Sequence, residues 1–152
     1  MKKALAFLAI LTLALTGFGA TKTFTIASVT PSCGTSTSPA LTVDDSSTLT
    51  DVSFTLAYDT AMLTHTGCTI LPSGWSVGTC SAAGGVVTVA ISGPALAAGV
   101  PGLVSVDFNV LGTVCDGDST ALNLEAVLYN TSNSGTAVDG LCTISCPANV
   151  PP

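Results

Sequence analysis

The sequence predicts an all-β domain, an antiparallel β-sandwich of about nine strands held by three disulfides. Three observations predict it: apolar and polar residues alternate in short segments, Gly, Pro, Asn and Asp separate those segments, and six cysteines follow an apolar leader. Alternation with a period of two gives each strand one face for a core and one for water. Two sheets of such strands can bury their apolar faces in one core.

The candidate strands follow in chain order. Alternation is clearest in segments 52–58, 87–92, 104–110 and 121–128. In the last of these, Leu122, Leu124, Ala126 and Leu128 share the apolar parity, so all four are expected to face the core. Shorter candidates complete the set: 24–29, 40–43, 63–70, 75–77 and 141–145.

A leader precedes the strands. Lys2 and Lys3 stand before an apolar run over residues 4–15, and mostly small residues follow it. This order is typical of a secretory signal peptide, and the run is shorter than the roughly 20 residues of a membrane span. We therefore expect residues 1–19 to be a signal peptide, cleaved after Gly19. Residues 20–152 are then a single secreted domain without a membrane span, and the short lysine leader is typical of bacteria.

Charge excludes some partners. The chain has 3 Lys and Arg residues against 9 Asp and Glu residues, and charged residues make up 8% of it. All three cations are lysines, and Lys22 is the only one after the leader. So acidic a chain cannot replace the counterions of a phosphate backbone, which excludes nucleic acid. Outward Thr and Ser side chains must therefore solvate the sheets.

The cysteines predict the covalent links. An even number of cysteines in an exported chain predicts three disulfides. The candidates are Cys33, Cys68, Cys80, Cys115, Cys142 and Cys146. Cys68 and Cys80 flank a short loop, and theirs is the pairing that we predict. Six cysteines allow many pairings, so the other connections stay open, although these four are expected to join the N-terminal region, the loop at Cys115 and the C-terminal strand.

No metal or cofactor is predicted. The sequence has no CxxC pair, and the single His65 is not spaced as a partner ligand for zinc. Structural calcium is the alternative, because Asp116-Gly117-Asp118 and Asp44-Asp45 offer carboxylates. Neither segment continues to the closing Glu of an EF-hand.

No catalytic residue is predicted either, so the chain is not expected to be an enzyme. A hydrolase needs a nucleophile with a base, or two placed carboxylates, whereas His65 is the only imidazole and Glu125 the only glutamate. Sugar binding would need exposed aromatic rings. Because Tyr58 has inward parity, Trp75 and Tyr129 are the candidate ligand contacts.

Three segments carry a resemblance to a known family. Residues 52–63, VSFTLAYDTAML, are similar to a family strand that ends in Tyr-Asp-Pro with a Leu three residues after the Pro, and Thr60 stands in place of the Pro. Residues 102–110, GLVSVDFNV, are similar to a Gly-led strand of the family's second half. Residues 117–124, GDSTALNL, are similar to its Gly-x-(Ser/Thr) entry to the penultimate strand. With the early Gly34-Thr35, the chain from about residue 24 to 146 resembles a cohesin domain.

Cohesins are secreted β-sandwich modules of cellulosome scaffolds, and their fold is related to that of some carbohydrate-binding modules. The resemblance implies a jelly-roll-like sandwich and a non-catalytic module that binds a protein partner in polysaccharide-degrading assemblies. That partner would be a dockerin, a paired calcium-loop module borne by enzymes. The six cysteines are not a general cohesin feature. Two other functions stay open: polysaccharide binding through Trp75 or Tyr129, and a structural role in an extracellular or envelope assembly.

Overall fold

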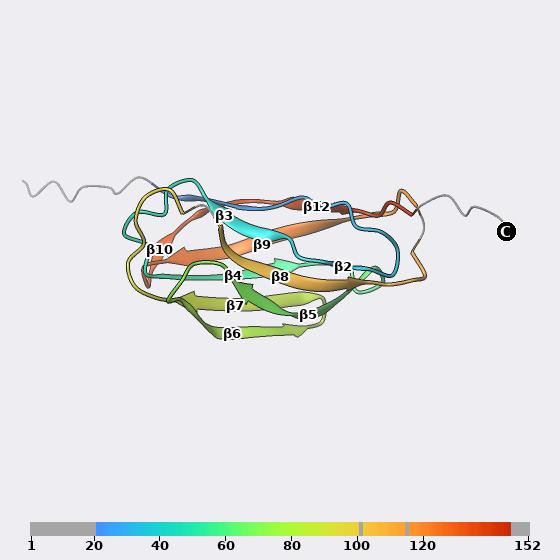
Figure 1. The fold of residues 1–152 in the computed structure, drawn as a ribbon, viewed down its shortest axis with the longest axis horizontal. Helices are drawn as coiled ribbons and strands as arrows, with labels where there is room; N and C mark the ends of the chain where they lie inside the picture. Colours follow the sequence, from blue (N-terminus) through green and yellow to red (C-terminus); the bar gives the residue numbers. More distant parts are fainter. Residues whose placement is uncertain (1–20, 101, 115, 147–152) are drawn as a thin grey trace, which may run out of the picture.

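The computed structural model describes residues 21–100, 102–114 and 116–146, and all regular secondary structure in them is β (Figure 1). Two sheets pack face to face, so the predicted all-β sandwich is confirmed. The predicted signal peptide and Cys115 lie outside the described residues. The described residues include no helix with the length and apolar character needed to cross a membrane.

Sheet 1 has six strands. They are β1 (Thr23–Ile26), β2 (Ser36–Thr37), β3 (Ala40–Val43), β5 (Leu63–Ile70), β8 (Gly102–Val110) and β11 (Thr136–Val138). The order is β11-β1-β3-β8-β2, in which β3 and β2 pair with successive parts of β8, residues 102–105 and 108–109. Strand β5 also pairs with β8, over residues 104–110. The β1–β11 pair is parallel, and the other pairs are antiparallel.

Sheet 2 also has six strands. They are β4 (Asp51–Ala57), β6 (Ser76–Ala83), β7 (Val86–Ser92), β9 (Ser119–Tyr129), β10 (Asn133–Ser134) and β12 (Gly140–Thr143). The order is β10-β9-β4-β7-β6, with β12 also paired to β9, and every pair is antiparallel.

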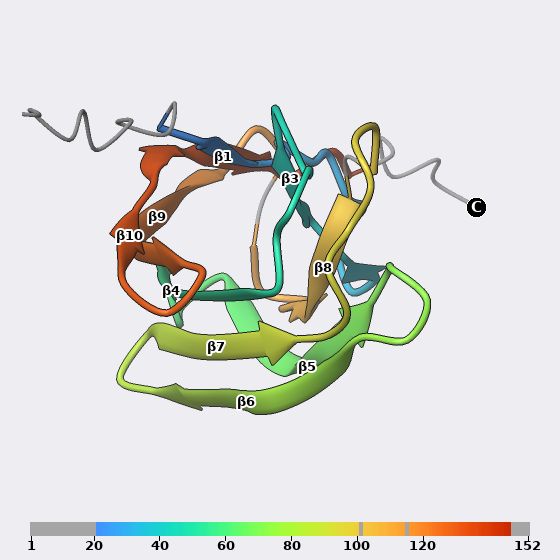
Figure 2. The same cartoon turned by 90° about the vertical axis from the view of Figure 1, so that its left-hand side faces the viewer.

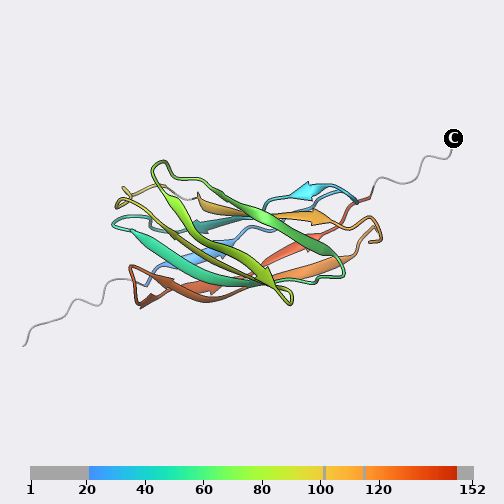
Figure 3. The same cartoon turned by 90° about the horizontal axis from the view of Figure 1, so that it is seen from below.

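The two sheets are joined along both long sides. On one side, the Cys68–Cys80 disulfide links β5 to β6, which lie next to each other when the molecule is seen from below (Figure 3). On the other side, the chain passes from β10 in sheet 2 to β11 in sheet 1 and back to β12 in sheet 2. The cross-section in Figure 2 is therefore nearly closed. This closure limits the strand edges that are free to pair with another chain.

Alternation builds the core as predicted along most strands. Val52, Phe54 and Leu56 of β4 are at most 2% exposed, and the residues between them are partly exposed. From sheet 1, Phe24 of β1 and Phe108 of β8 contribute fully buried side chains to the same core. Burying such side chains is the main term that stabilises a sandwich.

The alternation predicted for β9 is wrong beyond Leu124. Ala126 has a φ of 51°, and the register of β9 on β4 shifts at this point, so β9 holds an extra residue as a bulge. An extra residue reverses the order of inward and outward side chains. Val127 is consequently buried, whereas Leu128 is 39% exposed.

Two disulfides are present among the described residues. Cys68–Cys80 is confirmed, with Cα atoms 6.1 Å apart. Cys33–Cys146 connects the loop before β2 to the end of the chain beyond β12, with Cα atoms 5.3 Å apart. A third disulfide would need Cys115, which lies outside the described residues, so that prediction is not tested. Within the described residues Cys142 of β12 bonds to no other cysteine and packs in the core, where burial raises the pKa of its thiol.

Candidate functional site

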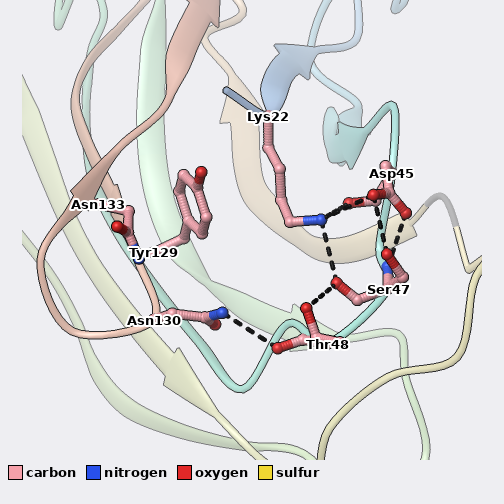
Figure 4. Close-up of a pocket in the computed structure, with 7 residues that line it drawn as sticks. All are labelled: Lys22, Asp45, Ser47, Thr48, Tyr129, Asn130 and Asn133. Atoms are coloured by element: carbon pink, nitrogen blue, oxygen red, sulfur yellow. Dashed lines mark hydrogen bonds and ion pairs between the residues drawn. The ribbon is translucent and has the colours of Figure 1, made fainter. Parts of the chain in front are cut away.

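A polar pocket of about 310 Å³ lies between the residues before β1, the loop after β3 and the turn from β9 to β10. The lining side chains are those of Lys22, Asp45, Ser47, Thr48, Tyr129, Asn130 and Asn133 (Figure 4). Neither composition nor strand periodicity pointed to this pocket, because its residues come from three separate turns.

Lys22 is only 8% exposed, and the chain itself satisfies its ammonium group. Lys22 Nζ donates to the backbone oxygen of Asp45 at 2.7 Å, to Asp45 Oδ2 at 3.0 Å and to the backbone oxygen of Ser47 at 3.0 Å (Figure 4). An ammonium group has three hydrogens to donate, so all are used. The single cation of the expected mature chain is therefore part of the fold and is not offered to a ligand.

The carboxylates of this loop are also engaged. Asp45 accepts hydrogen bonds from the Ser47 hydroxyl at 2.8 Å and the Ser47 amide at 2.9 Å, and these bonds, together with Lys22, lower the pKa of Asp45 to about 2. The backbone amide of Thr23 lowers the pKa of Asp44. Because Lys22 pairs with Asp45 and backbone amides bind Asp44, both carboxylates serve the fold, and Asp44-Asp45 gives no support to the calcium alternative.

The low pKa of Asp45 predicts how the variant Asp45→Asn responds to acid. A carboxyl whose pKa falls from 3.8 to about 2 on folding stabilises the fold above pH 4, and this contribution disappears as the pH falls through 2. Wild type should therefore be more stable than Asp45→Asn at pH 6, and the difference should shrink to nothing near pH 2. Urea unfolding at a series of pH values measures it. Glu125→Gln, on an exposed strand position, is the control. A difference that stays constant down to pH 2 would contradict the assignment.

The second calcium candidate also serves the fold. Asp116 Oδ1 accepts the backbone amide of Cys146 at 2.8 Å, which ties the loop after β8 to the end of the described chain. Among the described residues, the one place where three potential metal ligands converge is elsewhere, at His65, Cys68 and Cys80. The sequence prediction did not expect His65 to meet these cysteines.

Trp75 does not present the exposed ring that was predicted. Its side chain is 7% exposed, the ring covers Gly93 so closely that a Cβ there would have no room, and the indole Nε1 donates to the backbone oxygen of Pro94 at 3.0 Å. A partner satisfies the indole nitrogen, as is usual for a buried Trp. Trp75 therefore closes one end of the core.

Tyr129 is also buried, at 8% exposed, because the bulge at Ala126 turns it inward. Its ring centroid lies 5.7 Å from that of Phe24, and the side chain lines the polar pocket (Figure 4). The expectation of exposed rings is thus wrong for both candidates. Neither Trp75 nor Tyr129 offers a flat aromatic surface to a sugar.

The outer face of sheet 2 is broad and nearly uncharged. Its outward side chains are Asp51, Ser53, Thr55 and Ala57 of β4, Val86, Thr88, Ala90 and Ser92 of β7, Thr79, Ser81 and Ala83 of β6, Ala121, Asn123, Glu125 and Leu128 of β9, and Leu141 of β12. Only Asp51 and Glu125 in this set carry charge. Val86, Leu128 and Leu141 are three of the six large hydrophobic side chains exposed among the described residues. Across the strands they face the small side chains of Ala57, Ser53 and Ala121, so they stand singly on this surface.

Comparison with known proteins finds solved structures with a similar fold but no similar sequence. No protein-family model matches the chain, and no curated protein matches it in sequence. The sixth cohesin of scaffoldin B from Acetivibrio cellulolyticus, solved in complex with a dockerin mutant, matches with a TM-score of 0.69 and 13% identity, over 82% of this chain and 99% of that one. A non-cellulosomal cohesin from Archaeoglobus fulgidus matches with a TM-score of 0.62 and 18% identity, over 82% and 91%.

A third match is the cohesin module of a family 33 glycoside hydrolase from Clostridium perfringens, with a TM-score of 0.65 and 13% identity, over 84% of this chain and 98% of that one. At such identities the likeness concerns the fold. The described chain is an all-β sandwich of the cohesin type. The cohesin-like fold that the resemblance of segments 52–63, 102–110 and 117–124 implied is therefore confirmed.

Proposed function

We propose that this chain is an exported, non-catalytic binding module of cohesin type that recognises a protein partner with the outer face of sheet 2. The observation that carries the proposal is that face itself, which is almost free of charge, rich in hydroxyl groups and carries the exposed side chains of Val86, Leu128 and Leu141. Apolar anchors surrounded by hydroxyl groups suit a protein surface, where buried apolar contacts supply affinity and hydrogen bonds fix the orientation.

The other residues support binding rather than catalysis. His65, the single imidazole, faces the sulfur of a disulfide at 3.5 Å, where a hydrolase would place a hydroxyl or thiol nucleophile. Glu125 stands exposed on β9 without a second carboxylate beside it on that face. We therefore assign the chain no reaction.

The proposed partner is a dockerin or a module of similar kind. Two lines support this choice: the cohesin-like fold, and the dockerin bound by the scaffoldin B cohesin that matches this chain. The leader at residues 1–19 supports export, and mass spectrometry of the secreted protein should then find a chain that begins at Ala20.

A binding experiment with matched variants tests the face. A panel of purified dockerins is titrated against the immobilised chain, with calcium and with chelator. Binding should require calcium, because dockerins are built on calcium loops. Thr88→Lys, in the middle of the outer face of sheet 2, should weaken binding at least tenfold, since an unpaired ammonium group would be buried in the contact. Thr64→Lys, an equally exposed strand threonine on β5 of sheet 1, should leave affinity unchanged.

The outcomes separate the three functions. Equal loss with Thr88→Lys and Thr64→Lys would contradict the assigned face. Retention on insoluble polysaccharide without dockerin binding would favour a carbohydrate-binding module. Filaments formed by the purified chain would favour a structural role. Such filaments would have to use the few strand edges that remain free despite the closed sides of the sandwich.

A further inference from the structure

Three ligand-type side chains come together between β5 and β6, away from the proposed binding face. His65 and Cys68 lie on β5, and Cys80 lies on β6. The ring nitrogen and the two sulfur atoms lie within 4.8 Å of one another, and His65 Nε2 is 3.5 Å from Cys80 Sγ. All three residues are half-buried, so solvent reaches them.

A bulge in β5 produces this cluster. Residues three apart on a regular strand point to opposite faces. The register of β5 on β8 shifts between His65 and Gly67, which brings His65 and Cys68 to the same side. The exposures agree: these two are half-buried, whereas Thr66 and Thr69 are exposed. The bulge therefore overcomes the spacing that argued against His65 as a ligand.

The imidazole of His65 also packs against a buried aromatic side chain. His65 pairs across the sheet with Phe108, and the rings meet edge to face with centroids 5.8 Å apart. Phe108 is fully buried and packs in turn on Tyr58 at 4.9 Å. A ring fixed in this way presents Nε2 to the sulfurs without a large loss of rotamer freedom on binding an ion.

We propose that reduction of the Cys68–Cys80 disulfide opens a zinc site formed by His65 Nε2 and the two cysteine sulfurs, with a fourth position left to water. Zinc takes two thiolates and one imidazole as a known three-ligand set. With Zn–S bonds of about 2.3 Å and Zn–N bonds of about 2.0 Å, ligand atoms around one ion lie about 3–4 Å apart. The 3.5 Å separation of His65 Nε2 and Cys80 Sγ already falls in this range.

The chemistry balances with a dithiol as the reductant. The dithiol supplies two electrons and two protons, the bond between Cys68 and Cys80 breaks to give two thiols, and the dithiol closes to its own disulfide. Zinc then displaces the two thiol protons as the Zn–S bonds form. Disulfide and zinc exclude each other, and either one links β5 of sheet 1 to β6 of sheet 2. The ion would thus take over the cross-link between the sheets.

Cobalt(II), the spectroscopic substitute for zinc, tests the site. It is titrated into the reduced full chain and into the reduced Cys68→Ser/Cys80→Ser variant, which keeps every other thiol. The full chain should show thiolate-to-cobalt charge-transfer absorption that saturates after binding one more equivalent of cobalt per chain than the double variant binds. This absorption should disappear when zinc is added. Identical spectra from the two proteins would overturn the proposal.

The role of the imidazole has its own variant. His65→Ala keeps both sulfurs but should weaken cobalt binding by more than the roughly 10–100-fold that loss of an outer-shell partner costs, and it should shift the visible ligand-field bands. Thr66→Ala, the exposed neighbour on β5, is the matched control and should bind like wild type. Unchanged affinity in His65→Ala would overturn the assignment of His65 as a ligand.

The reduced chain must also keep its fold. Trp75 is the only tryptophan and lies in the loop between Cys68 and Cys80, so its fluorescence reports this region directly. Cys68→Ser/Cys80→Ser, studied without reductant, shows whether the sandwich persists without this bridge while Cys33–Cys146 stays intact. Loss of β structure in both the reduced chain and this variant would overturn the proposal, because no preformed site would remain.

Discussion

Replacing Cys33 and Cys146 together by serine is expected to lower the free energy of unfolding by about 4–5 kcal/mol. The bridge closes a loop across 113 residues, and the chain entropy removed from the unfolded state grows with loop length. The native state should change little, because the Ser145 amide still donates to the backbone oxygen of Pro31 at 2.9 Å beside the bridge. A domain whose total stability is about 5–15 kcal/mol would then be close to unfolding.

The second disulfide provides the control. Cys68 and Cys80 are 12 residues apart, so Cys68→Ser/Cys80→Ser should cost about 3 kcal/mol. Both bridges join half-buried cysteines, so the comparison mainly varies loop length. Guanidinium unfolding followed by Trp75 fluorescence and by circular dichroism measures both variants. An equal or smaller loss for the Cys33–Cys146 pair would contradict the loop-length argument.

The sequence predicted what depends on local pattern. Alternation and turn residues predicted the exact bounds of β3 and β5, and the bounds of β4, β7 and β8 to within two residues at each end. This works because a half-buried strand has one apolar face and one polar face, so its own sequence shows the alternation. The pairing of Cys68 with Cys80 was also a local inference. Short strands such as β2, β10 and β11 were missed, because two or three residues carry no period and are strands only through their partners.

The candidate sites were predicted less well, because bulges decide them. A bulge depends on the register between two strands, which neither strand contains alone. The bulge at Ala126 buried Tyr129, and the bulge next to Gly67 brought His65 to Cys68. Only Gly67 gave a sequence signal, since a glycine inside a strand often marks such a site.

Other features of the site come from contacts between distant segments. Lys22 was predicted only as the last cation of the mature chain, and its bonds to the Asp45 loop cross 23 residues of sequence. The Cys33–Cys146 bridge is equally non-local. In contrast, the outer face of sheet 2 follows from the alternation of β4 and β7, which explains why outward Thr and Ser side chains could be predicted from the sequence.

Leu124→Ala is expected to cost about 2–5 kcal/mol, whereas Leu128→Ala on the same strand should change stability by no more than about 0.5 kcal/mol. Simple alternation gives both leucines the same inward parity. The bulge at Ala126 separates them, so Leu124 is 3% exposed and Leu128 is 39% exposed. Truncating the first leaves a cavity between the sheets, whereas the second lies on the outer face and its truncation opens no cavity in the core. Urea unfolding of the two variants measures the difference.

Val127→Ala completes the test of the bulge. Val127 would face water if β9 were regular, but it is 4% exposed, so this smaller truncation should cost more than Leu128→Ala. A larger loss for Leu128→Ala than for Val127→Ala would show that β9 runs without the bulge. The stability of Leu128→Ala also bears on the binding experiment. If this variant keeps its stability, any loss of partner affinity that it shows comes from the outer face of sheet 2 and not from a weakened sandwich.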